Sequence, residues 1–159
     1  MATDRDALAA ALRKRGAELS LLEFMRQAWP ILDPERPFIA GAHVRAMCAK
    51  LESVTRGEIR RLMINVPPGY TKSRTVSVMW PCWEWIIHPE YRYICGSYAA
   101  SLAIDHSIER RSVVTSDWYL GNWGDRVRLG SADPGQVQFS NLSGGKMVAT
   151  GVGGAALGR

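Results

Sequence analysis

Hydrophobic positions in the first 55 residues recur at helical spacing. Between residues 4 and 29, apolar side chains return every three or four positions, which predicts a long helix that Gly16 can divide in two. Prolines at positions 30, 34 and 37 predict its end and an extended connector after it. The same spacing over residues 42–54 predicts a second helix, closed by Gly57 in a left-handed conformation.

The middle of the chain alternates between short apolar runs and longer helical patterns. Residues 60–66 form a near-continuous apolar run, which predicts a strand buried on both faces. A helix is expected from about Lys72, interrupted at Pro81. A second strand over 91–96 and a second helix over 97–115 follow. This alternation predicts a mostly parallel sheet flanked by crossover helices, that is, an α/β fold.

The pattern changes again beyond residue 116. Residues 117–123 read as a loop with aromatic anchors. Short strands are expected at 126–129 and 137–140, around a turn at 133–135, followed by a turn at 143–145 and a strand at 146–150. This spacing is typical of an antiparallel hairpin at a sheet edge. The glycine-rich stretch 151–159 follows it.

Size and composition favour one globular domain. The chain has 159 residues, of which 47% are hydrophobic and 22% charged, and this balance excludes disordered and fibrous classes. Within it, we distinguish an N-terminal helical segment, residues 1–36, from an α/β part, residues 37–159. No apolar run approaches the ~20 residues that span a bilayer, and the charged N-terminus lacks the apolar core of a signal peptide.

The net charge indicates the kind of binding partner, and the cysteine positions bear on metal and redox sites. A net charge of +5 favours an anionic partner, either a nucleotide or a nucleic acid. The three cysteines are widely spaced among apolar neighbours, and the three histidines are scattered. These positions have no zinc-site or redox spacing, so we expect reduced, buried cysteines in a cytosolic protein.

Residues 65–73 carry the clearest chemical signal. A predicted strand, a tight Pro-Pro-Gly turn and a Lys-Ser pair opening a helix form the layout of a phosphate-binding loop. In such loops the backbone N–H groups hold phosphate oxygens, the lysine neutralises the β- and γ-phosphates, and the serine hydroxyl binds Mg²⁺. The residues assigned to this loop are Pro68, Gly69, Tyr70, Thr71, Lys72 and Ser73.

The loop departs from the usual pattern G-x-x-x-x-G-K-[ST]. Val66 and Thr71 occupy the two glycine positions, and Gly69 lies inside the loop instead. From these residues alone, a simple turn between a strand and a helix, with Lys72 in solvent, is an equal alternative. Other segments are needed to decide between the two.

Several ordered segments resemble the phage terminase large subunits, from about residue 20 to the last residue. Segment 57–73 is similar to the ATPase entry of that family, where the loop often lacks the standard glycines. Segment 37–43 resembles its Phe…Gly-x-His element. Similar segments also occur at 98–103, at Arg110 and Arg111, at Tyr119 and at 144–154.

The resemblance implies an ASCE-type P-loop NTPase that uses ATP and Mg²⁺ to drive viral double-stranded DNA into procapsids. Its implied partners are the portal protein and the terminase small subunit, and its implied setting is a homo-oligomeric ring in the host cytoplasm. Lys72 is then catalytic, Ser73 is the Mg²⁺ ligand, and Arg110 or Arg111 is an arginine finger. Phe38 and His43 are candidates for the adenine edge. The simpler alternatives are a solvated basic helix face and a packed histidine.

Other features set this chain apart from the family. Many members have an arginine where Gly69 stands, and we do not assign that role to nearby Arg74. The family's apolar strand ending in two acidic residues is not found in this sequence, nor is the nuclease domain. We therefore expect an N-terminal fragment or truncated gene product with an incomplete ATPase domain, which hydrolyses ATP poorly. Two alternatives remain: a non-catalytic helical interaction module, residues 1–60, with an inert loop, and an unrelated P-loop enzyme such as a small kinase.

Overall fold

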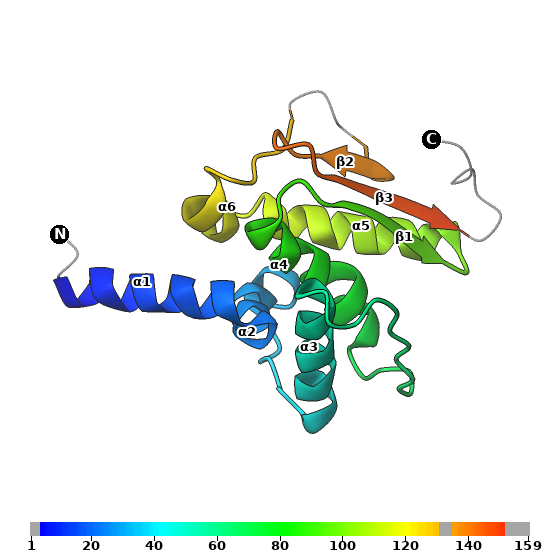
Figure 1. Cartoon of the computed structure of the whole chain (residues 1–159), viewed down its shortest axis with the longest axis horizontal. Helices are drawn as coiled ribbons and strands as arrows, with labels where there is room; N and C mark the ends of the chain where they lie inside the picture. The colour runs from blue at the N-terminus through cyan, green and yellow to red at the C-terminus, as the bar shows by residue number, and fades with distance from the viewer. Residues whose placement is uncertain (1–3, 131–134, 152–159) are drawn as a thin grey trace.

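The computed structural model describes residues 4–130 and 135–151 (Figure 1). Within these ranges the chain is a mixed α/β protein, as the alternation of patterns predicts. The helices are α1 (Asp4–Leu19), α2 (Leu21–Leu32), α3 (Ala42–Thr55), the π-helix η1 (Arg74–Met79), α4 (Trp80–Ile87), α5 (Ala100–Val114) and α6 (Asp117–Trp123). The strands are β1 (Arg92–Ser97), β2 (Gln138–Ser140) and β3 (Lys146–Gly151).

The described strands form one mixed sheet in the order β1-β3-β2. β1 and β3 run parallel, with Arg92 opposite Lys146, and α5, the first element of the connection between them, lies along the sheet (Figure 1). β2 and β3 run antiparallel, with Phe139 opposite Met147. The predicted crossover helix and edge hairpin are confirmed. The sheet is mixed rather than mostly parallel, because it holds a single parallel pair.

The strand predicted over residues 60–66 is wrong. This segment is extended, but it belongs to no ladder of the described sheet. Met63 is 84% exposed and Leu62 is 37% exposed, while Ile64 packs partly against the core. An apolar run indicates burial, whereas a strand also needs a neighbour that pairs with its backbone groups. The strand predicted over 126–129 is also reduced, to a single bridge between Leu129 and Asn141.

Residues 117–123, predicted as a loop, are the helix α6. Ser116 caps it, because its side-chain oxygen accepts a hydrogen bond from the N–H of Tyr119 at 3.2 Å. Tyr119 and Trp123 lie one turn apart and are both buried, with their ring centroids 5.3 Å from each other. A serine cap followed by aromatic residues at i and i+4 indicates a helix. The high aromatic content of this segment is also typical of an anchored loop, which is what was predicted.

The first helical pattern divides at Ser20 rather than at Gly16. Ser20 caps α2, and α2 continues through Pro30 to Leu32, beyond its predicted end. The first part of α1 extends away from the rest of the molecule (Figure 1), and contact with α2 begins at Arg13, whose carbonyl accepts a hydrogen bond from the side chain of Gln27 at 2.9 Å. Its apolar residues Leu8 and Leu12 are 62% and 64% exposed, so the first part of the predicted stripe is not a core face.

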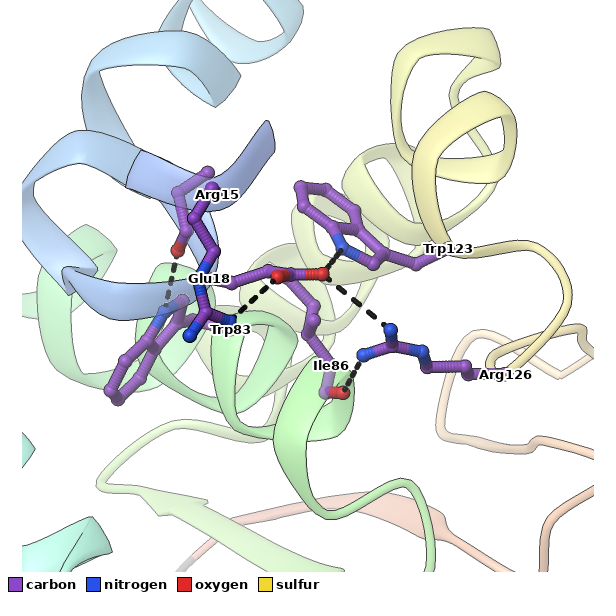
Figure 2. A network of polar contacts seen from close by, with 7 residues as sticks. Arg15, Glu18, Trp83, Ile86, Trp123 and Arg126 are labelled. Atoms are coloured by element: carbon purple, nitrogen blue, oxygen red, sulfur yellow. Dashed lines mark hydrogen bonds and ion pairs between the residues drawn. The ribbon is translucent and has the colours of Figure 1, made fainter. Parts of the chain in front are cut away.

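A polar network ties the end of α1 to the body of the protein (Figure 2). Glu18 accepts a hydrogen bond from the indole of Trp123 at 3.1 Å and pairs with Arg126 at 3.6 Å. The indole of Trp83 donates to the carbonyl of Ala17 at 2.9 Å. Behind this network, α1 and α2 share one hydrophobic core with α3, α4, α5, α6 and the sheet. Within the described ranges, no helix is long and apolar enough to cross a lipid bilayer.

Candidate phosphate-binding site

A cavity of about 630 Å³ lies between the connector that follows α2 and the loop that precedes η1. All loop residues assigned from the sequence, Pro68 to Ser73, line it, and so does Phe38. The full lining is Trp29, Asp33, Arg36, Pro37, Phe38, Ile39, Pro67, Pro68, Gly69, Tyr70, Thr71, Lys72, Ser73 and Arg74. The structure therefore joins the predicted loop to one of the two residues expected at an adenine edge.

The loop backbone takes left-handed conformations at two places. Gly69 has a φ of 84°, and Thr71 has a φ of 62°. Thr71 is the one non-glycine residue with positive φ among the described residues. Positive φ in a β-branched residue is strained, and such strain clusters at functional sites. Thr71 stands where the usual phosphate loop has its second glycine, so the backbone keeps a glycine-like conformation without the glycine.

Lys72 and Ser73 open the helix that leaves the loop, and both are exposed. The carbonyl of Thr71 accepts hydrogen bonds from the N–H and the hydroxyl of Thr75, each at 2.9 Å, and these bonds fix the first turn. The first N–H groups of a helix have no partner within it and carry a partial positive charge. An exposed helix start that carries a lysine beside a cavity suits an anion.

The helix that follows is a π-helix over η1, and Pro81 comes just after it. In an α-helix the carbonyl of Ser77 would accept from the N–H of residue 81, which proline lacks. Arg110 replaces that donor: its Nη1 donates to the Ser77 carbonyl at 2.6 Å. The interruption expected at Pro81 thus takes the form of a π-helical segment stabilised from α5.

Neither arginine considered as a finger lines the cavity. Arg110 is fully buried, and its Nε and Nη2 have no hydrogen-bond partner. Arg111 is partly exposed, and its Nη1 lies 3.4 Å from the carbonyl of Gly135. Because Arg110 is buried, Arg111 is the one of these two arginines that is accessible to solvent.

The two adenine-edge candidates separate. The ring of Phe38 lies 5.2 Å from that of Trp29, and both rings line the cavity. His43 instead packs edge-on against Tyr70, with 5.1 Å between the ring centroids, and supports the loop from outside the lining.

Trp29, Asp33 and Arg74 line the cavity, although none of them was assigned a role there from the sequence. Arg74 pairs with Asp33 at 3.2 Å and lies 5.4 Å from the Trp29 ring. The indole of Trp29 also donates to the Arg36 carbonyl at 3.0 Å, which holds the connector against α2. No sequence spacing links Arg74 to Asp33, because they are 41 positions apart in the chain.

A second cavity, of about 410 Å³, also reaches the start of this helix. Leu62 and Ile64 of the extended segment line it, together with Trp80, Lys72 and Ser73. Lys72 and Ser73 therefore line both cavities.

The residues present fit a magnesium ion that arrives with a polyphosphate. In the described part of the chain, no group of three or more His, Cys, Asp or Glu residues is placed to hold a metal. Mg²⁺ commonly takes one or two protein oxygens, with the remaining ligands from water and substrate phosphates. The exposed hydroxyl of Ser73 at the cavity wall can supply such a ligand.

Comparisons with protein-family models, with curated proteins and with solved structures give no match. The interpretation of the site therefore depends on its own residues and geometry.

Proposed function

We propose that this chain binds a nucleoside triphosphate, ATP with Mg²⁺, in the cavity between the α2 connector and the loop before η1. The observation that carries the proposal is the cavity lining. The loop residues Pro68 to Ser73 meet the aromatic rings of Trp29 and Phe38 around one space. A phosphate-binding helix start at one part of a cavity and apolar rings at another suit the two chemical halves of a nucleotide.

Each residue has a role that follows from its chemistry. The ammonium group of Lys72 neutralises the β- and γ-phosphates, and the N–H groups at the helix start donate to their oxygens. The hydroxyl of Ser73 serves as a ligand of the magnesium. The rings of Phe38 and Trp29 offer an apolar surface to the base. When bound, the ion adds positive charge beside the phosphates.

The wider proposal is a role in viral DNA packaging, as the ATP-binding part of a terminase large subunit of the P-loop NTPase class. The ordered run of similar segments along the sequence supports it, and so does the glycine-like backbone of Thr71. The portal protein, the small subunit, double-stranded DNA and a homo-oligomeric ring are the corresponding partners. Asp33 is the one carboxylate in the cavity lining of the described chain, and Arg74 pairs with it. We therefore expect ATP binding with slow hydrolysis.

Calorimetric titration of the chain with Mg-ATP tests the nucleotide site. Lys72→Ala is expected to weaken binding at least tenfold, because a phosphate-neutralising cation is lost. Lys50→Ala is the matched control, since Lys50 is an exposed lysine on α3 away from the cavity. Equal affinities for the wild type and Lys72→Ala would contradict the proposal.

One observation favours the alternative of a helical interaction module. α1 extends from the body with Leu8, Leu12 and Leu19 more than 60% exposed (Figure 1). Exposed leucines along one helix are typical of a surface that a partner covers. This alternative predicts no Mg-ATP binding that depends on Lys72, so the same titration separates the two functions.

A further inference from the structure

Arg74 is the first residue of η1 and directly follows Ser73. Its guanidinium is fixed on two sides. Nη1 lies 3.2 Å from a carboxylate oxygen of Asp33, at the end of α2. Nε and Nη2 lie 3.1 Å and 3.0 Å from a carboxylate oxygen of Glu109, on α5. The guanidinium carbon is also 5.4 Å from the centre of the Trp29 ring, so three helices determine its position.

The two carboxylates differ in their relation to the cavity. Asp33 and Arg74 line it, whereas Glu109 does not. An aspartate beside a site for a polyphosphate repels the ligand unless a cation compensates its charge. Arg74 supplies that compensation, and its own side chain remains 31% exposed. A guanidinium has five N–H donors, more than these three contacts use.

We propose that Arg74 is a second phosphate-binding cation of this cavity, anchored by Glu109 and restrained by Asp33 until a polyphosphate enters. The inference rests on the proposed nucleotide site. Phosphate oxygens compete with the Asp33 carboxylate for the same N–H groups, and a guanidinium binds phosphate through paired hydrogen bonds. Glu109 keeps the side chain at the cavity while that exchange takes place. Asp33 therefore opposes binding, and Arg74 promotes it.

The test is a calorimetric titration of the full chain with two probes, inorganic tripolyphosphate and adenosine. Arg74→Gln is expected to weaken tripolyphosphate binding about tenfold, or about 1.4 kcal/mol, and to leave adenosine unchanged. Asp33→Asn is expected to strengthen tripolyphosphate binding several-fold, because it removes a repelling charge and releases the arginine. A purely structural arginine would move both probes together, and Asp33→Asn would then give no gain. Arg45→Gln, an exposed arginine on α3, is the control.

Two further variants keep the outcome decisive. Arg74→Gln loses two ion pairs, so its fold is checked by circular dichroism. If it does not fold, Arg74→Lys replaces it, and we expect a several-fold weakening because an ammonium cannot form the paired contact. Unchanged tripolyphosphate binding in Arg74→Lys would overturn the inference. Lys72→Ala separates the two levels: if it has no effect, the nucleotide site itself is wrong. If Lys72→Ala weakens binding and the Arg74 variants do not, only the role of Arg74 is wrong.

Discussion

Arg110 donates a hydrogen bond of 2.6 Å to the carbonyl of Ser77, at the point where Pro81 leaves the helix without a donor. A side chain from α5 thus donates to a backbone carbonyl in the helix that follows the loop 68–73. Nε and Nη2 of Arg110 are buried without hydrogen-bond partners. The bond to Ser77 is therefore formed by a charged group that lies in the interior of the protein. Arg110 thus adds a contact from α5 to those that hold the helix after the loop.

The contact predicts coupling between two mutations. Arg110→Met removes the donor that α5 supplies to the Ser77 carbonyl, and Pro81→Ala restores an N–H one turn away. We expect Arg110→Met to be less destabilising by about 1 kcal/mol in the Pro81→Ala background than in the wild type. Urea unfolding of the four proteins gives the coupling free energy. Additive effects would show that the carbonyl does not need the arginine.

Thr71 predicts a stabilising substitution. Its φ of 62° costs about 1–3 kcal/mol in a β-branched residue, and glycine removes that strain at an entropic cost of roughly 1 kcal/mol. Thr71→Gly is therefore expected to raise the free energy of unfolding, by about 1 kcal/mol, without loss of Mg-ATP binding. Gly69→Ala, at a φ of 84°, is the opposite control and should destabilise the protein. A destabilised Thr71→Gly would mean that the threonine side chain contributes more than its strain costs.

The network around Glu18 predicts that removal of this carboxylate lowers the stability of the protein more than removal of an exposed one (Figure 2). Glu18→Ala leaves the buried indole N–H of Trp123 without its acceptor, so we expect a loss of about 1–3 kcal/mol in unfolding free energy. Glu23→Ala removes an exposed pair with Arg26 and should change stability by less than about 0.5 kcal/mol. Chemical denaturation of the two variants measures both values. Similar losses in both would exclude a special role for the Trp123 contact.

The cysteines predict a loss of stability in alkali. Burial raises the pKa of the Cys48 thiol from 9.0 to about 12, and the neighbouring Glu52 charge adds to this shift. The unfolded chain then releases this proton at lower pH than the folded chain. The contribution is therefore complete below pH 9 and is lost as pH rises towards 12, at about 1.4 kcal/mol per pH unit. Urea unfolding between pH 8 and 11 should show a shallower decline for Cys48→Ala than for the wild type; parallel curves would contradict this.

Contiguous features of the site could be predicted from the sequence, and features assembled from distant segments could not. The loop from Pro68 to Ser73 depends on local order alone, so the proline-glycine turn and the Lys-Ser pair were sufficient to place it. Arg74 and Asp33 meet only because α2 and η1 pack together. For the same reason, spacing gave no indication that Arg110 is buried, since a charged residue on a helix is usually exposed.

The fold shows the same division. The hairpin and the helix α5 follow from period and turn residues, and the structure contains both. The apolar segment 60–66 has the composition of a buried strand but no ladder partner among the described residues, because pairing depends on what lies beside it. In α6 the signal is the cap at Ser116, whose side-chain oxygen accepts from the N–H of Tyr119 in the first turn.

The sheet order has a consequence for how the chain assembles. β3 lies between β1 and β2, yet it is the last of the three described strands in the chain. On a ribosome, β1 emerges before its only described partner exists, and the helices that share the core can pack first. The two outer strands join one sheet only when residues 146–151 have been made. Removal of those residues would therefore remove the pairing of both β1 and β2, whereas α3 would still be present for α2 to pack against.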